Sequence, residues 1–132
     1  MITWDEKTMA TGVAELDAQH KKLFQKFNEF SDAIAGKKSL EAAGEILDFL
    51  QFYAKWHFGQ EEECMDKYKC PIAAQNKNAH AEFLKKFERF YTEWQTGNMT
   101  SKLAQKTYDE LEQWLINHVA RTDAQLRPCV RK

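Results

Sequence analysis

The strongest constraint on the fold is a helical repeat of apolar residues in four successive stretches of the chain. The stretches cover roughly residues 17–35, 39–66, 72–95 and 100–124. In each of them apolar side chains recur every three or four positions, as Leu103, Leu111, Trp114 and Leu115 do in the last. Alternation at period two, which would indicate strands, is absent from this pattern. Because helices of about 20 residues with short connections pack as antiparallel neighbours, we predict an all-α, up-down-up-down antiparallel four-helix bundle.

Three breaks separate the stretches. Glycine is unfavourable inside a helix, and proline suits only its first turn. Each break contains a glycine or a proline next to polar residues. The breaks fall at residues 36–39, 69–71 and 97–98. Ser39, and either Thr100 or Ser101, are suited to cap the helices that follow. The length fits one domain over residues 1–132, with residues 1–16 as an N-terminal arm along the bundle.

The charge of the chain is nearly balanced. Lys and Arg number 19 against 20 Asp and Glu, which gives a formal net charge of −1 at pH 7. This balance offers no basic surface for nucleic acid or an anionic membrane, and no apolar run approaches the roughly 20 residues that span a bilayer. We therefore expect no nucleic-acid partner and no membrane insertion. The basic ending, Arg127, Arg131 and Lys132, is interpreted as a solvated tail.

The cysteines and the N-terminus bear on the cellular compartment. Cys64, Cys70 and Cys129 are odd in number and show no CxxC spacing, so a disulfide framework is not expected. The first residues lack a basic segment followed by an apolar run, and therefore lack a visible secretory signal. Reduced thiols without a signal predict a cytoplasmic protein.

Four histidines carry the first functional signal, because one falls in each helical stretch. They are His20, His57, His80 and His118, and each continues the apolar stripe of its stretch. A single histidine in a core is more often hydrogen-bonded than a metal ligand. Four neutral imidazoles in one apolar core each need a polar partner, however. A metal ion supplies such a partner, and imidazole suits Fe, Zn, Cu and Ni, so the pattern favours a metal site.

Two carboxylates are candidates to complete this site. Glu61 follows His57 by one helical turn, so the two side chains point the same way. Its neighbours Glu62 and Glu63 are better explained as exposed charges. Asp123 lies five residues after His118, about 140° away around an ideal helix, and geometry alone does not assign it to the site.

Three strings of residues resemble hemerythrin and bacteriohemerythrin. They are the run 12–21, the run 57–62, and Trp114 to His118 together with Asp123, and the similarity extends from about Trp4 to Leu126. Members of this family bind O2 reversibly at a non-haem di-iron centre. The resemblance implies two iron ions joined by an oxo or hydroxo bridge. It implies as terminal ligands His20, His57, His80 and His118, and as bridging ligands Glu61 and Asp123.

One position departs from the family pattern. Family members have a proline, a histidine five residues later and a second histidine after four more, whereas here Pro71 is followed by Asn76 and His80. In the family that first histidine belongs to the iron with three imidazoles. Asn76 offers only a neutral carboxamide oxygen, so it acts as a weak ligand or orients a water. The change predicts a more open coordination at that iron and puts long-lived O2 binding in question.

Several further residues are assigned around this centre. The resemblance implies an apolar O2 pocket lined by Leu23, Phe58, Trp114, Leu115 and Val119, all of which also suit a bundle core. Tyr53, one turn before His57, is positioned to hydrogen-bond a ligand. Cys64, about two turns after His57, is either a thiol near the metals or a buried structural cysteine. Gly59 inside a helix costs about 1 kcal/mol relative to alanine, which indicates close approach of another element.

Together these features predict a di-iron protein that binds O2 or a related small diatomic or peroxide ligand, as a carrier, store or sensor. A rival from another class is a di-iron enzyme with peroxidase-like or ferrous-oxidising activity, which an open position near Asn76 would favour. A regulatory module has no direct support, because no output segment is visible in the sequence.

Overall fold

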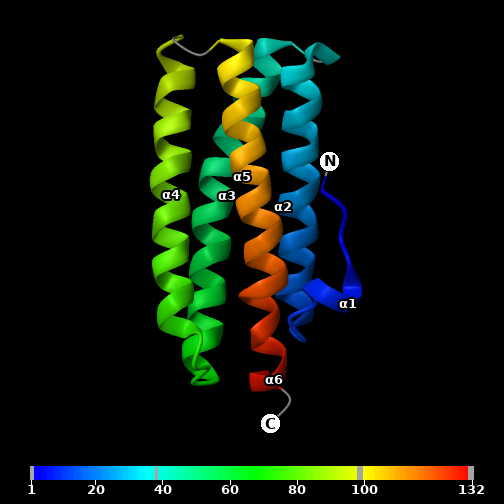
Figure 1. Cartoon of the computed structure of the whole chain (residues 1–132), viewed down its shortest axis with the longest axis vertical. Helices are drawn as coiled ribbons and strands as arrows, with labels where there is room; N and C mark the ends of the chain where they lie inside the picture. The colour runs from blue at the N-terminus through cyan, green and yellow to red at the C-terminus, as the bar shows by residue number, and fades with distance from the viewer. Residues whose placement is uncertain (1, 38, 98–99, 131–132) are drawn as a thin grey trace.

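The computed structural model describes residues 2–37, 39–97 and 100–130, and within these ranges all regular secondary structure is helical. The elements in chain order are α1 (Glu6–Met9), α2 (Ala14–Asp32), η1 (Ala33–Lys37), α3 (Leu40–Lys67), α4 (Ala73–Gln95), α5 (Ser101–Arg121), η2 (Asp123–Gln125) and α6 (Leu126–Val130). The four long helices α2, α3, α4 and α5 stand side by side and alternate in direction (Figure 1). The predicted up-down-up-down bundle is confirmed.

The helix starts follow the capping chemistry that the sequence indicates. The Ser39 hydroxyl accepts a hydrogen bond from the Ala42 N–H at 3.1 Å and caps α3. Thr100, rather than Ser101, caps α5 by accepting from the Leu103 N–H at 3.1 Å. Such caps satisfy backbone donors that have no partner in the first turn.

The breaks between helices depend on left-handed backbone conformations. Gly36, the residue before the end of η1, has φ of 88°, a region that glycine enters without steric cost. Lys69, before Pro71, has φ of 51° in the turn between α3 and α4. Lys38 and Asn98, which belong to two of the predicted breaks, lie outside the described residues.

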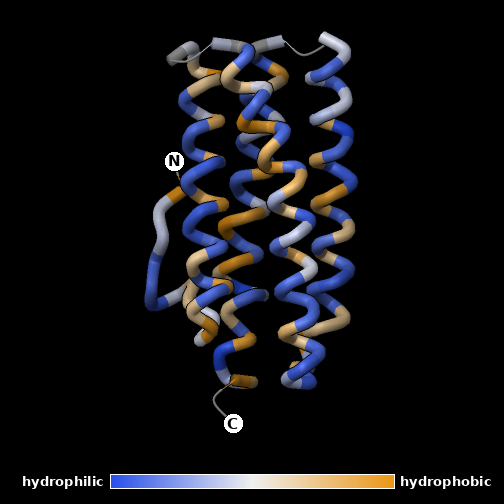
Figure 2. The backbone as a smooth tube through the Cα atoms, turned by 180° about the vertical axis from the view of Figure 1, so that it is seen from behind, coloured by the Kyte–Doolittle hydropathy of each residue, from blue (hydrophilic) through white to orange (hydrophobic). Residues whose placement is uncertain are grey.

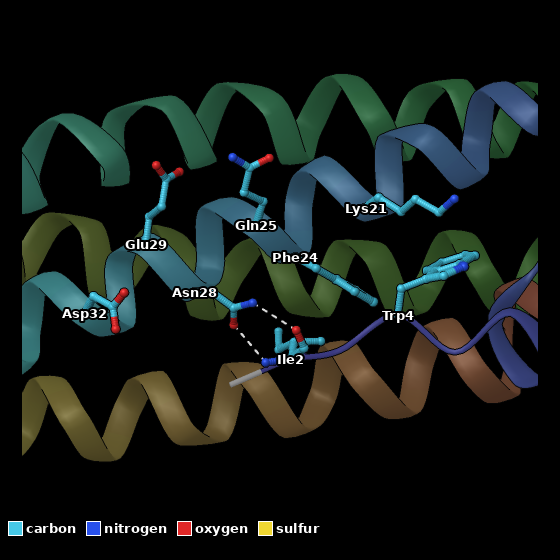
Figure 3. A pocket seen from close by; sticks show the side chains of 8 residues that line it. All are labelled: Ile2, Trp4, Lys21, Phe24, Gln25, Asn28, Glu29 and Asp32. Carbon is cyan, nitrogen blue, oxygen red and sulfur yellow. Dashed lines mark hydrogen bonds between the residues drawn. The ribbon is translucent and has the colours of Figure 1, made fainter.

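The N-terminal residues form an arm along α2. The Ile2 N–H donates to Asn28 Oδ1 at 2.7 Å, and the Ile2 carbonyl accepts from Asn28 Nδ2 at 2.9 Å (Figure 3). Because α2 begins at Ala14, the described arm covers residues 2–13 and is shorter than predicted. This two-way pairing with one side chain fixes the arm to the bundle.

The C-terminal residues return to this arm, which corrects the interpretation of a solvated basic tail. Arg127 Nε donates to the Ala10 carbonyl at 2.8 Å. The side chain therefore joins the two ends of the described chain. Arg131 and Lys132, the rest of that tail, lie outside the described residues.

The core between the long helices is rich in aromatic residues. Hydrophobic segments recur along each helix between hydrophilic ones (Figure 2). Phe27, Phe30 and Phe90 are buried, and Phe30 meets Phe90 edge to face with ring centroids 5.9 Å apart. Burial of each such side chain is worth about 1.5–3 kcal/mol. The assignment of Leu103 to the apolar stripe is wrong, because Leu103 is 40% exposed and its neighbour Ala104 is buried instead.

The cysteines contradict the sequence prediction. Cys70, in the turn before α4, and Cys129, in α6, form a disulfide whose Cα atoms lie 5.7 Å apart. An odd number of cysteines simply leaves Cys64 as a free thiol. Spacing rules miss the pair because the two residues are 59 positions apart and meet only when the bundle closes. The prediction of a cytoplasmic location assumed reduced thiols, and the disulfide removes that support. In the described helices we find no segment with the length and apolarity needed to cross a bilayer.

Candidate metal centre

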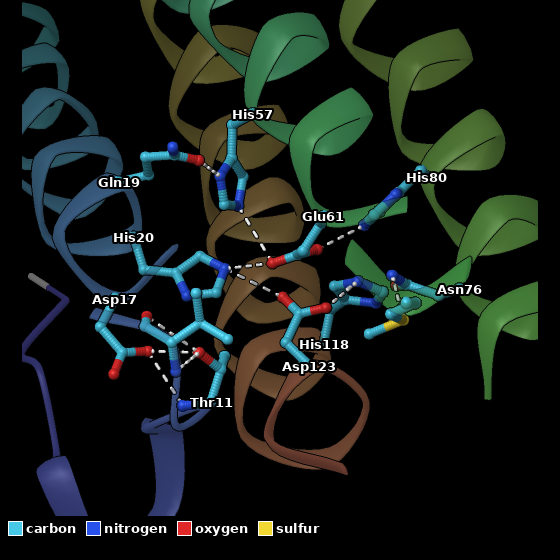
Figure 4. Close-up of polar contacts among 12 residues, drawn as sticks. Thr11, Asp17, Gln19, His20, His57, Glu61, Asn76, His80, His118 and Asp123 are labelled. Carbon is cyan, nitrogen blue, oxygen red and sulfur yellow. Dashed lines mark hydrogen bonds and ion pairs between the residues drawn. The ribbon is translucent and has the colours of Figure 1, made fainter. Parts of the chain in front are cut away.

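The four histidines come together inside the bundle, one from each long helix. His20, His57 and His80 are at most 1% exposed, and His118 is 6% exposed. The ring centroids of His20 and His57 lie 4.5 Å apart, and those of His80 and His118 lie 4.9 Å apart. Figure 4 shows the rings arranged around Glu61 and Asp123. Because each histidine lies on the apolar face of its helix, which packs inward, all four reach the same interior site.

Glu61 lies between the two pairs of histidines. Its Oε2 atom is 2.6 Å from His20 Nε2 and 3.2 Å from His57 Nε2. Its Oε1 atom is 3.0 Å from His80 Nε2 on the other side (Figure 4). The carboxylate is fully buried. Each oxygen of Glu61 thus faces a different pair.

Asp123 repeats this arrangement from the end of α5. Its Oδ2 atom is 3.1 Å from His20 Nε2, and its Oδ1 atom is 3.1 Å from His118 Nε2. The helical phase that argued against Asp123 does not apply, because α5 ends at Arg121 and the chain continues as a 3-10 turn. This change in backbone turns a buried carboxylate toward the histidines.

These contacts define two positions within one cluster. The first position lies among His20, His57, Glu61 Oε2 and Asp123 Oδ2. The second position lies among His80, His118, Glu61 Oε1 and Asp123 Oδ1. Ligand atoms of His20, His57 and Glu61 lie within 4.8 Å of one another, as do those of Glu61, His80, His118 and Asp123.

The atoms that face these positions have no hydrogen bonds. Among the described residues, neither the four Nε2 atoms nor the four carboxylate oxygens of the cluster find a hydrogen-bond partner, although all are buried. The short nitrogen–oxygen contacts within the cluster are ion pairs. Buried polar atoms normally have hydrogen-bond partners. Four nitrogen and four oxygen atoms without one, directed at two shared centres, fit a pair of metal ions.

Two side chains outside the cluster orient its histidines. His57 Nδ1 donates to Gln19 Oε1 at 2.7 Å, and His80 Nδ1 donates to Glu62 Oε2 at 3.1 Å. With Nδ1 protonated, Nε2 presents its lone pair to the cluster. Gln19 was missed from the sequence, and Glu62 was wrongly treated as an exposed charge. Tyr53 donates to the Gln19 carbonyl at 3.4 Å instead of to a histidine.

Asn76 is buried on α4, one turn before His80. Its Nδ2 atom donates to Met65 Sδ at 3.1 Å (Figure 4). Its Oδ1 atom has no hydrogen-bond partner among the described residues. The amide is thus held by a thioether on one side and keeps an unsatisfied acceptor on the other.

Aromatic rings cover the histidines of the second position. Phe58 stacks on His80 with centroids 3.9 Å apart, and Trp114 stacks on His118 with centroids 4.4 Å apart. Trp114 is half-buried, whereas Phe58 is 2% exposed. The other residues of the predicted pocket are buried in the core, and they are Leu23, Leu115 and Val119. Cys64 is absent from the described ligand groups and packs on a small apolar cluster near Leu126, which favours the structural alternative.

Charge coupling among the buried histidines and carboxylates of the cluster is strong. Burial by itself lowers the pKa of His20, but Glu61 and Asp123 outweigh it and raise that pKa to about 10. Burial likewise disfavours the charged form of His80, whose pKa is nevertheless raised, mainly by Glu61. Burial raises the pKa of Glu61, whereas His57 and His20 bring it well below its usual range. A cation that binds in this cluster must therefore displace protons from the histidines.

Comparisons with known proteins agree with this geometry. The family model described as the hemerythrin HHE cation binding domain matches residues 11–130. A bacteriohemerythrin of Methylococcus capsulatus is 28% identical over 130 residues, covering 98% of this chain and 97% of its own. That of Aquifex aeolicus is 27% identical and covers 94% of each chain. A crystal structure of wild-type hemerythrin, 27% identical, superimposes with a TM-score of 0.89 over 100% of this chain and 99% of its own. The chain belongs to the hemerythrin family.

Proposed function

We propose that the cluster holds two iron ions and that the protein binds O2, or a related small molecule, reversibly as a carrier, store or sensor. The observation that carries this proposal is the sharing of both carboxylates between the two positions. Glu61 and Asp123 each direct one oxygen at each position. Two cations held side by side repel each other, and two bridging negative charges offset that repulsion.

The donor set supports iron in particular. Imidazole and carboxylate together suit iron, and the two positions use no thiolate. Four imidazoles and two carboxylates are more donors than one four-coordinate zinc ion takes. When bound, ferrous ions would supply the electrons that O2 accepts and returns. The protein residues supply binding, orientation and exclusion of water.

The roles of the surrounding residues follow from their contacts. Gln19 and Glu62 fix the ring orientation of His57 and His80. Phe58 and Trp114 stack on ligand rings and provide an apolar wall, which would exclude water and slow loss of the bound molecule. We propose the same function for the other pocket residues, Leu23, Leu115 and Val119.

Asn76 makes the second position more open than a third histidine would. Its amide nitrogen is engaged by Met65, so the only group that it can offer a cation is its neutral oxygen. Each position then has two imidazoles. The comparisons give no support to the alternative of a di-iron enzyme, because the matched relatives are bacteriohemerythrins and hemerythrins.

An anaerobic reconstitution tests the proposal. The metal-free protein is loaded with ferrous ion, its iron content is measured, and its absorption spectrum is recorded with O2 and again after argon removes the O2. We expect close to two irons per chain and a visible band that forms with O2 and disappears under argon. The Glu61→Ala variant should form no such band. Iron at one per chain or below, or a spectrum that does not respond to O2, would reject the proposal.

A further inference from the structure

The histidines of the cluster are not all held from behind in the same way. His57 Nδ1 donates to Gln19, and His80 Nδ1 donates to Glu62. His20 Nδ1, in contrast, is buried and has no hydrogen-bond partner among the described residues. A ligand histidine is normally oriented by the group that accepts from its second ring nitrogen. The orientation of the His20 ring therefore depends on other contacts.

The N-terminal arm supplies such a contact through Trp4. Its indole stacks on the His20 ring, with centroids 6.2 Å apart and an interplanar angle of 28°. Offset aromatic stacks occur at centroid distances of about 4.5–7 Å. Trp4 is half-buried, whereas His20 is 0% exposed. The indole is thus the outer of the two rings and lies against the histidine from the side of the arm.

The indole is itself fixed by several neighbours on α2 and the arm. Phe24, one turn after His20, meets it with centroids 6.1 Å apart, and Lys21 Nζ lies 5.4 Å from its centroid (Figure 3). Its Nε1 atom donates to Glu6 Oε2 at 2.6 Å. Because contacts reach both its faces and its edge, the indole has little freedom to move away from the histidine.

The backbone of the arm is anchored on both sides of Trp4. Before it, Ile2 is 3% exposed and forms two hydrogen bonds with Asn28. After it, the Ala10 carbonyl accepts from Arg127 Nε at 2.8 Å. A segment held at both ends presents its aromatic ring at a defined place on α2. The arm is therefore a support that can hold a neighbouring ring in position.

We propose that Trp4 is the positioning residue of His20, and that its stack takes the place of the missing hydrogen bond at Nδ1. The indole limits rotation of the imidazole, so that Nε2 stays directed at the first position. Among the ring contacts of the described residues, Trp4 meets neither His80 nor His118. Loss of the indole should therefore weaken the first position much more than the second. The inference rests on the proposed function only in that the first position binds a cation.

Zinc ion tests this inference without iron or O2, because it suits imidazole and has no redox chemistry. Competition with a chromophoric chelator gives the zinc affinity, and anomalous diffraction at the zinc edge, from crystals with limiting zinc, gives the occupancy of each position. We expect Trp4→Ala to lower the affinity of the first position about tenfold, the lower end of the usual loss when a group behind a ligand is removed. Zinc beside His80 and His118 should be retained.

Two other replacements of Trp4 separate positioning from the filling of space. Trp4→Phe keeps a flat ring and should restore most of the zinc affinity, whereas Trp4→Leu keeps apolar bulk without a stack and should behave like Trp4→Ala. Trp94→Ala is the matched control, because Trp94 is a half-buried indole that packs on Phe30 and Phe90 in the core. It should lower thermal stability and leave both zinc affinities unchanged.

A second control changes stability in the opposite direction. A Cβ atom added at Gly59 would meet nothing within 4 Å, so the close approach that the sequence predicts at this glycine is not found in the described part of the chain. Gly59→Ala should therefore raise thermal stability. It should leave both zinc affinities unchanged, which would show that they do not simply follow stability.

The outcomes distinguish this inference from the proposed function. A first-position affinity that is unchanged or higher in Trp4→Ala, as a water reaching His20 Nδ1 would give, overturns the inference. Equal losses at both positions, or the same loss in Trp94→Ala, also overturn it, because they indicate a general loss of stability. If the expected zinc results are obtained and the iron-loaded protein does not respond to O2, the proposed function fails and the role of Trp4 stands.

Discussion

The first and second positions have equal numbers of imidazoles but different surroundings. At the first position His20 and His57 meet edge to face, and the amide of Gln19 accepts from His57. At the second position two aromatic rings stack on His80 and His118. The first position is therefore backed by a neutral hydrogen-bond acceptor, and Trp4 stacks on His20 at 6.2 Å, farther than the 3.9 Å and 4.4 Å of the rings at the second position.

The second position also carries the two side chains that most distinguish it. Glu62 accepts a hydrogen bond from His80 and adds a negative charge behind that ring, whereas Gln19 at the first position is neutral. Asn76 stands one turn from His80 with an unsatisfied oxygen. Equal numbers of imidazoles therefore do not make the two positions equivalent. Glu61 and Asp123 join the two positions. The different side chains behind the histidines make the surroundings of each position different.

Loss of a shared carboxylate should have the largest effect, because it affects both positions together. We expect Glu61→Ala and Asp123→Ala to lose most of the second iron, leaving about one iron per chain or less. His80→Ala removes a ligand from the second position only and should retain more iron. Iron analysis after identical reconstitution measures the difference, and equal retention in all three variants would contradict a shared pair.

Asn76→His should sharpen the difference between the positions by adding a third imidazole to the second. A barrier raised by about 1.4 kcal/mol would lengthen the life of the oxygenated protein roughly tenfold. Stopped-flow spectra of the ferrous proteins mixed with O2 give the two lifetimes. Asn76→Ala is the control, since it removes the amide and supplies no ligand. If the natural protein already holds O2 for long times and Asn76→His does not improve it, the account of this position is wrong.

Gln19→Ala and Glu62→Ala should each weaken one position and leave the other nearly intact. Loss of a hydrogen bond to a ligating histidine lowers metal affinity by roughly 10–100-fold. Competition with a chelator should therefore release one iron from either variant sooner than from the natural protein. Release of both irons at the same rate would show that these side chains do not act on separate positions.

Cysteine replacement should have the smallest effect on the two positions. Neither half of the Cys70–Cys129 disulfide belongs to a described ligand group, so Cys70→Ser should keep the iron content and the spectrum. The same variant should lower the free energy of unfolding by roughly 2–5 kcal/mol, the usual result when a native disulfide is lost. Thermal unfolding with Cys64→Ser as the control measures this. A spectrum altered by Cys64→Ser would instead assign that thiol to the cluster.

The sequence predicted the helices and the meeting of four histidines inside the bundle, because both depend on the same local period. His57 and Glu61 share a helix face, and a one-turn spacing is enough to place them together. Asp123 could not be placed by that period, since its position depends on where α5 changes to a 3-10 turn. The contact of Gln19 with His57 and the Cys70–Cys129 disulfide were not predicted, for another reason. Their contacts join segments 38 and 59 positions apart, and only the closed bundle brings these together.

We propose that one cluster holds two ions that share Glu61 and Asp123. Anomalous diffraction at the iron absorption edge, from crystals of the reconstituted protein, tests this most directly. We expect two anomalous peaks, one beside His20 and His57 and one beside His80 and His118, with one oxygen of each carboxylate at each peak. A single peak, or two peaks that do not share both carboxylates, would contradict the account.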